Sequence, residues 1–226
     1  MKWIYPNEWS PDTANSELVR DINFLFQAKL NTRDLIECLG KTRYTAVVTG
    51  FWYEYGLAKK ENFGFDFSGR RVRFFDEGLA RVPVSTGRQV GRAVAALLSL
   101  PLESKGGEQP CLKQYRDKAV YTNSFTVSQR DILASACRVT GSKEEDWMVD
   151  HVDSTESVGQ GHREINERNP SGYSKILYPR VFYCNGDGDF ESSKGTINDA
   201  LGLPKENLDE FTRIAMERQL AGGDGP

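Results

Sequence analysis

Short apolar runs alternate with helical patterns along the chain, and this alternation most constrains the fold. The runs are rich in β-branched and aromatic residues and predict strands at 2–5, 44–49, 71–75, 119–123 and 147–152. Apolar residues at helical spacing predict helices over 16–39, 86–99, 127–140, 153–168, 174–184 and 204–220. A polar loop is expected at 103–118. Strands that alternate with helices are typical of an α/β fold.

Composition excludes several classes of protein. The chain has 226 residues, 38% of them apolar, and a net charge of −3, so nucleic acid and anionic membranes are not expected partners. No run approaches the ~18 apolar residues of a membrane span, and no secretory signal follows the first residue. A cytoplasmic location is therefore expected. The cysteines form no CxxC pair, and Cys38 and Cys137 fall in apolar helical patterns, so buried free thiols are predicted.

A lysine near the middle of an apolar helix face is the first candidate for chemistry. On a helix that turns about 100° per residue, several apolar residues lie within about 40° of Lys29. They are Leu18, Ile22, Leu25 and Ile36. Burial disfavours the charged form of a lysine, which suits it to proton transfer. The alternative is a helix that breaks near Asn31, which would let the Lys29 side chain reach solvent.

A second candidate follows the strand at 44–49, in the stretch YTAVVTGFWYEYGL. Four aromatic residues occupy the five positions after Gly50. Ligands of open α/β sheets lie beyond the carboxyl ends of the strands, so these rings are candidates to wall an organic pocket. Packing in the core is the alternative reading of the same rings. The first strand ends similarly, in a polar loop at 6–9, and both loops are expected at one sheet edge.

These stretches, taken in order, resemble the NmrA-like family, and especially its fungal, isoflavone-reductase-like members. WIYPNEW is similar to the family's rFiPSEFG stretch, AKLNTRDLIE to its lysine-bearing helix, and YTAVVTGFWYEYGL to its wT.i..G.F.d..l stretch. FFDEG, TGRQVGRAVAALLS and SFTVSQRDILASACRVTG resemble later elements of the fungal group. The resemblance covers nearly the whole chain, and it implies a Rossmann fold that binds NADP(H).

The resemblance also implies roles for particular residues. Lys29 matches the active-site lysine, which lies near the nicotinamide and assists proton transfer. Asn7 and Glu8 match the Ser-Glu pair of the loop beside the cofactor, although Asn at the Ser position departs from the family. Gly50, Phe51 and Trp52 match the loop that closes over the nicotinamide end. No metal site is expected, because the calcium-like run at 185–196 lacks the required Gly and Glu.

In the family, the stretch that matches residues 3–9 belongs to the fifth strand of the Rossmann sheet. The 226 residues contain no GxxGxxG, so the glycine-rich phosphate loop is absent from the sequence. We therefore expect a truncated C-terminal half of a Rossmann sheet that binds NADPH weakly or not at all. The predicted sheet remnant covers 1–58 and 86–123. A substrate-side α/β lobe is predicted at 59–85 and 124–220, and a disordered tail at 221–226.

Two functions are consistent with these features. The first is an NAD(P)H-dependent oxidoreductase that acts on a small, aromatic metabolite and is poorly active in this truncated form. The second is a non-catalytic NmrA-like regulator that senses redox state, or an interaction module. A small-molecule substrate is the expected partner of the first, while a protein partner or a homodimer is expected for the second.

Overall fold

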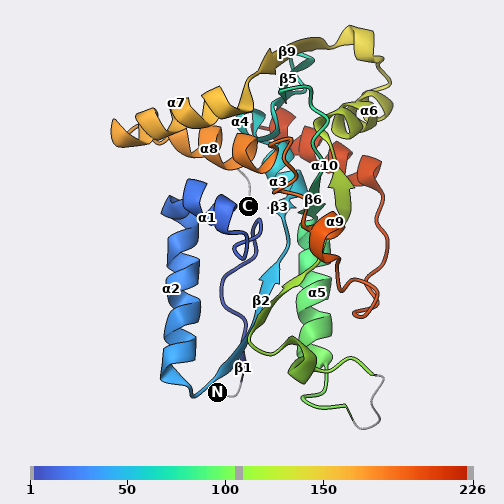
Figure 1. Cartoon of the computed structure of the whole chain (residues 1–226). Coiled ribbons are helices and arrows are strands. Elements are labelled where there is room, and N and C mark those ends of the chain that lie inside the picture. The colour runs from blue at the N-terminus through green and yellow to red at the C-terminus, as the bar shows by residue number, and fades with distance from the viewer. Residues whose placement is uncertain (1–2, 105–108, 223–226) are drawn as a thin grey trace.

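A parallel sheet with helices on both faces forms one half of the molecule (Figure 1). The computed structural model describes residues 3–104 and 109–222. Strands β1 (Trp3–Ile4), β2 (Arg43–Val48) and β7 (Lys118–Tyr121) pair in the order β1-β2-β7, and both pairings are parallel. The two-sided cover explains why β2 is buried over five of its six residues.

Helices α2 (Asn23–Leu39) and α5 (Gly87–Ser99) cover opposite faces of this sheet. Successive side chains of a strand point to opposite faces, so Tyr44 and Val47 of β2 face different layers. The Tyr44 hydroxyl donates to Glu37 of α2 at 2.7 Å, whereas Val47 packs with Leu97 of α5. This arrangement is the α/β layering predicted from the sequence.

Two further three-stranded sheets continue the chain. The first joins β3 (Phe51–Trp52), β6 (Val82–Ser85) and β8 (Phe125–Val127) in the order β3-β6-β8, with the second pairing antiparallel. The second joins β4 (Phe65–Asp66), β5 (Arg71–Phe75) and β9 (Met148–Val152) in the order β4-β5-β9, with the first pairing antiparallel.

Helices enclose the core that these sheets share. They are α1 (Ser16–Asp21), α3 (Tyr53–Leu57), α4 (Lys60–Phe63), α6 (Gln129–Thr140), α7 (Ser154–Asn166), α8 (Gly172–Val181), α9 (Phe190–Lys194) and α10 (Leu208–Leu220). Short 3₁₀ helices lie at Leu112–Tyr115 and Glu144–Asp146. Helices α7 and α8 pack closely at two glycines, where a Cβ on Gly161 would lie 2.7 Å from the carbonyl oxygen of Gly172.

Several predicted boundaries are confirmed and others are wrong. The strand at 71–75 is β5, and the helix at 86–99 is α5 with Thr86 as its N-cap. The predicted helix over 16–39 is two helices, because Ile22 leaves the helical conformation at φ −115° and ψ 30°. The predicted helix over 127–140 begins only at α6, after β8, and the last helix begins at Leu208 rather than at 204.

The cysteine prediction is half right. All four cysteines are free thiols, as expected. Cys38, however, is exposed and Cys137 is only partly buried, because the face of α2 that carries Cys38 has no covering layer among the described residues. Residue 2 of the first predicted strand, 105–108 of the predicted loop and 223–226 of the predicted tail lie outside the described residues.

The division of the chain into a sheet remnant and a substrate-side lobe stays a prediction. Among residues 3–104 and 109–222, none of the helices is both long enough and apolar enough to cross a membrane.

Candidate functional site

Lys29 points from α2 to the loop that follows β1. Its Nζ donates to the carbonyl oxygen of Asn7 at 2.7 Å and to that of Glu8 at 3.4 Å. The residue is half-buried. Burial lowers the pKa of the Lys29 ammonium below its ordinary value, and the negative charge of Glu8 offsets part of that shift. The structure therefore places the ammonium against the loop and not in open solvent.

The side chain of Glu8 is fully buried below this contact. Its Oε1 lies 3.1 Å from the Nε of Arg33, and its Oε2 accepts a hydrogen bond from the Thr13 hydroxyl at 2.5 Å. The guanidinium of Arg33 also donates to the carbonyl oxygen of Thr13 at 3.0 Å. The Glu8 carboxylate is thus engaged within the protein, where it fixes the loop to α2, whereas the neighbouring Asn7 is exposed.

Gly50 joins the end of β2 to the same loop. Its N–H donates to the carbonyl oxygen of Ser10 at 3.2 Å. Its φ is +66°, and a Cβ there would lie 1.9 Å from the carbonyl oxygen of Pro83. Only glycine fits a backbone that is both left-handed and this close to a neighbouring strand. The glycine at this position is therefore explained by packing, whether or not a ligand approaches it.

The two aromatic residues after Gly50 point in different directions. Trp52 is 41% exposed, and its indole N–H donates to the carbonyl oxygen of Trp9 at 3.2 Å. Phe51 is buried and stacks on Tyr178 with ring centroids 4.2 Å apart. Trp52 can present a ring face to a ligand, whereas the ring of Phe51 belongs to the core.

Three consecutive carbonyl groups therefore hold the candidate residues together. Those of Asn7 and Glu8 accept from Lys29, and that of Trp9 accepts from Trp52. Because adjacent residues are about 3.8 Å apart, the ammonium and the indole are anchored on neighbouring peptide units. The loops after the first two strands were predicted to lie at one sheet edge, and the structure brings both of them together with Lys29 at the carboxyl ends of β1 and β2.

The sequence did not predict the side-chain contacts that fix this loop, namely those of Arg33 on α2 and of Lys194 near the C-terminal end of the chain. The sequence places Arg33 one helical turn after Lys29, but it does not predict that Arg33 pairs with the buried Glu8. The buried carboxylate of Asp12 pairs with Lys194 of α9 and accepts a 3.3 Å hydrogen bond from the Tyr121 hydroxyl. No local pattern could have predicted a contact between residues so far apart in the sequence.

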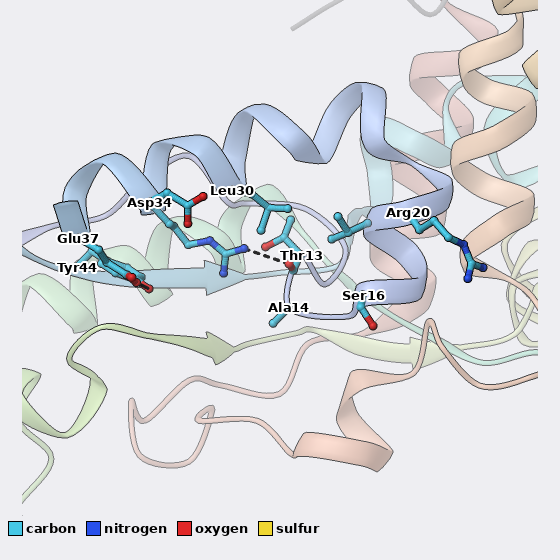
Figure 2. A pocket seen from close by; sticks show the side chains of 10 residues that line it. Thr13, Ala14, Ser16, Arg20, Leu30, Asp34, Glu37 and Tyr44 are labelled. Carbon is cyan, nitrogen blue, oxygen red and sulfur yellow. Dashed lines mark hydrogen bonds between the residues drawn. The ribbon is translucent and has the colours of Figure 1, made fainter.

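A cavity of about 490 Å³ lies beside the Glu8–Arg33 pair, between the start of α1, α2 and the start of β2. Figure 2 shows its lining, including the hydrogen bond to Thr13. Its lining includes two arginine and two carboxylate side chains together with the apolar Val19 and Leu30. Lys29 does not line it, so this cavity adjoins the candidate site without containing the lysine. Within the described ranges, no group of three or more His, Cys, Asp or Glu side chains could hold a metal ion.

Comparison with known proteins places this geometry in a known fold. No protein-family model matches the chain, and no curated protein matches it in sequence. The crystal structure of isoflavone reductase superposes with a TM-score of 0.67 at 19% identity, over 94% of this chain. The chain has the fold of isoflavone reductase. The leucoanthocyanidin reductase–NADPH complex from Vitis vinifera shows the same fold, with a TM-score of 0.67 at 11% identity over 96% of this chain.

The isoflavone-reductase fold is only partly represented by these residues. The chain spans 65% of the isoflavone reductase structure and 66% of the leucoanthocyanidin reductase structure. Pinoresinol-lariciresinol and phenylcoumaran benzylic ether reductases match similarly, with a TM-score of 0.66 at 13% identity. The partial Rossmann fold predicted from the sequence is confirmed, while the closer resemblance to the NmrA-like family stays a prediction.

Proposed function

We propose that this chain belongs to an NAD(P)H-dependent oxidoreductase that acts on a small aromatic or conjugated metabolite. The observation that carries the proposal is the half-buried Lys29 ammonium, held beside the exposed ring of Trp52 at the carboxyl ends of two parallel strands. Ligands of open α/β sheets bind at this edge. The proposal is further supported by a fold shared with proteins described as reductases, one of them in complex with NADPH.

The residues around Lys29 fit the nicotinamide end of the dinucleotide better than its pyrophosphate. The ring of Trp52, which is partly exposed and anchored on loop 7–9, suits a flat nicotinamide. The pyrophosphate needs backbone N–H groups at a helix N-terminus reached through small residues, and the sequence contains no glycine-rich loop of that kind. When bound, the cofactor would supply a hydride. We therefore expect the chain as printed to bind NADPH weakly or not at all.

Lys29 has a donor for a substrate and a pKa that burial lowers. An ammonium group carries three N–H donors, and two of them are engaged by the carbonyl groups of Asn7 and Glu8. The third has no partner among the described residues and can donate to a substrate oxygen. Burial lowers the pKa of Lys29, so its proton is transferred more readily than that of a lysine in water. In the proposed reaction Lys29 donates this proton to the substrate.

The first test is to determine the transcript upstream of Met1 and to assay the protein that it encodes. We expect an encoded glycine-rich βα turn, NADPH-dependent turnover, and loss of turnover in Lys29→Met with NADPH affinity unchanged. Lys143→Met is the matched control, because that side chain is 78% exposed and pairs only with the neighbouring Glu145 among the described residues. A transcript without such a turn, or a Lys29→Met variant with full turnover, would contradict the proposal.

The exposed apolar surface of α2 favours the second candidate function, a non-catalytic regulator that binds a protein partner or a second copy. Phe24, Leu25, Leu35 and Leu39 are between 36% and 58% exposed. Exposed apolar clusters often mark interaction surfaces. Retained partner binding with no turnover, in both the wild-type protein and Lys29→Met, would favour the regulator over the enzyme.

A further inference from the structure

We propose that a second cavity, lined by none of the Lys29-site residues, binds a small organic anion, namely a carboxylate attached to one apolar ring. The cavity has a volume of about 250 Å³ and lies among α4, β5, β9, α7 and α8. Its floor is apolar and its rim is cationic. The residues that carry the argument are Lys60, Arg73, Phe75, Val152, Lys175 and Pro179.

The floor follows from the register of β5 and β9. Side chains alternate along a strand, so Arg73 and Phe75 share one face of β5. Phe75 pairs with Val152 of the parallel strand β9, and paired residues of parallel strands point to the same side of the sheet. Pro179 of α8 lines the cavity as well. A ring inserted here would contact carbon atoms from two strands and one helix.

The rim is positive in a protein whose net charge is −3. Lys60, Arg73 and Lys175 line the cavity with a single carboxylate, that of Glu61. The described residues already provide close partners for two of these cations. Lys60 lies 2.8 Å from Asp66, and Lys175 forms an ion pair with Glu164.

Arg73 is the cation that is left without a close partner in the described part of the chain. Its guanidinium has one carboxylate within ion-pair distance, Glu61, and that separation is 4.0 Å. The side chain is 57% exposed. A planar guanidinium with free donors matches a carboxylate in bidentate geometry, which is stronger and more directional than a single contact.

An apolar floor together with a cationic rim favours an organic anion over other ligands. Inorganic phosphate would meet the cations but would leave the floor of Phe75 and Val152 without a partner. A neutral ring would cover the floor but would leave Arg73 unpaired. The volume is below the usual range for drug-sized ligands and far too small for a dinucleotide, so a single ring with one carboxylate is the appropriate size.

The test is a binding titration of the chain as printed, at low ionic strength, followed by backbone NMR. The probes are benzoate, its neutral isostere benzamide, and inorganic phosphate. We expect benzoate to shift the amide signals of Gly64 and Val152 and to bind more tightly than either of the other probes. Salt should weaken the binding, because the contact is between charges near the surface.

Two variants identify the responsible group. Arg73→Gln should weaken benzoate binding about tenfold or more, as expected for the loss of a charge-assisted hydrogen bond. Arg71→Gln is the matched control, because Arg71 lies on the same face of β5, pairs with Asp150 at 3.3 Å and does not line this cavity. Both arginines are more than half exposed, so both variants are expected to fold.

The proposal is overturned if benzoate causes no saturable shift, if benzamide or phosphate binds equally well, or if Arg73→Gln binds benzoate like the control. None of these measurements requires NADPH or turnover, so their outcome is independent of the function proposed for Lys29.

Discussion

Replacing the buried Arg180 should destabilise the protein more than any substitution of a surface arginine. The Arg180 side chain is 2% exposed and joins two parts of the chain. Its Nε donates to Asp21 at the end of α1 at 2.5 Å, and its Nη2 donates to Asp187 at 2.7 Å. The carbonyl oxygen of Asp187 also accepts from the Asn15 side chain at 3.3 Å. The guanidinium thus fastens the segment after loop 7–9 to the C-terminal part of the fold.

The expected loss of stability follows from the burial of the Arg180 side chain. An Arg180→Met substitution keeps the length of the side chain but removes the buried cation from Asp187 and from Asp21, which retains only its contact with the exposed Arg20; both carboxylates are about one-fifth exposed. Breaking a buried ion pair from one side costs about 3–5 kcal/mol. A loss of 1 kcal/mol lowers Tm by about 2–4 °C in a chain of this length, so we expect a decrease of roughly 6–20 °C.

The loss of stability caused by Arg180→Met should also depend on pH. Burial tends to raise the pKa of Asp21, but hydrogen bonds from Arg20 and Arg180 outweigh it and hold that pKa below its ordinary value. A carboxyl group of this kind contributes stability above its unfolded pKa of about 3.9, and the contribution is lost as the pH falls through the folded pKa. The difference in stability between wild type and Arg180→Met should therefore narrow below about pH 4.

Urea unfolding and calorimetry measure both effects. Arg163→Met on α7 is the control, because Arg163 is exposed and its loss should change stability by no more than about 0.5 kcal/mol. A loss below about 1 kcal/mol for Arg180→Met, which is typical of an exposed ion pair, would refute the reasoning.

Further predictions concern the loop that holds Lys29. Gly50→Ala should lower the free energy of unfolding, measured in urea, at least twice as much as Gly40→Ala. A Cβ at Gly50 would lie 1.9 Å from the carbonyl oxygen of Pro83, whereas a Cβ at Gly40 would have no atom within 4 Å. Both positions have φ above +60°, so an alanine at either one also costs about 1–2 kcal/mol in backbone strain. Equal losses of stability in the two variants would show that the clash with Pro83 is relieved. Glu8→Gln should lower the free energy of unfolding by about 3 kcal/mol or more, because it leaves Arg33 without its buried counter-charge. An unchanged urea midpoint would contradict the ion pair between Glu8 and Arg33.

The sequence predicts elements whose signals are local. The strand at 71–75 is recovered with both ends correct, because an apolar run is followed by a turn in which Asp76 and Gly78 adopt positive φ. The helix that begins after Thr86 is recovered because its N-cap side chain accepts from the N–H of Gln89. These signals lie within a few residues of the feature that they specify.

Features that depend on distant contacts are not visible in the sequence. Ile22 breaks the predicted long helix although isoleucine is not a helix breaker, and its side chain is fully buried in the core. The helical wheel placed Leu25 beside Lys29 on one apolar face, yet Leu25 is 37% exposed. Lys29 is nevertheless turned inward, because the loop after β1 covers it. The pairing of Asp12 with Lys194 could not be predicted for the same reason.

Titration of the Lys29 ammonium tests the central claim most directly. NMR of the chain carrying ¹³Cε-labelled lysine, with Lys29→Met used to assign the signal, measures this pKa without cofactor or substrate. The structure predicts a pKa below the ordinary 10.5, and a further decrease in Glu8→Gln, because the charge of Glu8 favours the ammonium. A Lys29 pKa at the ordinary 10.5, unmoved by Glu8→Gln, would contradict the contact between Lys29 and loop 7–9 and the function proposed from it.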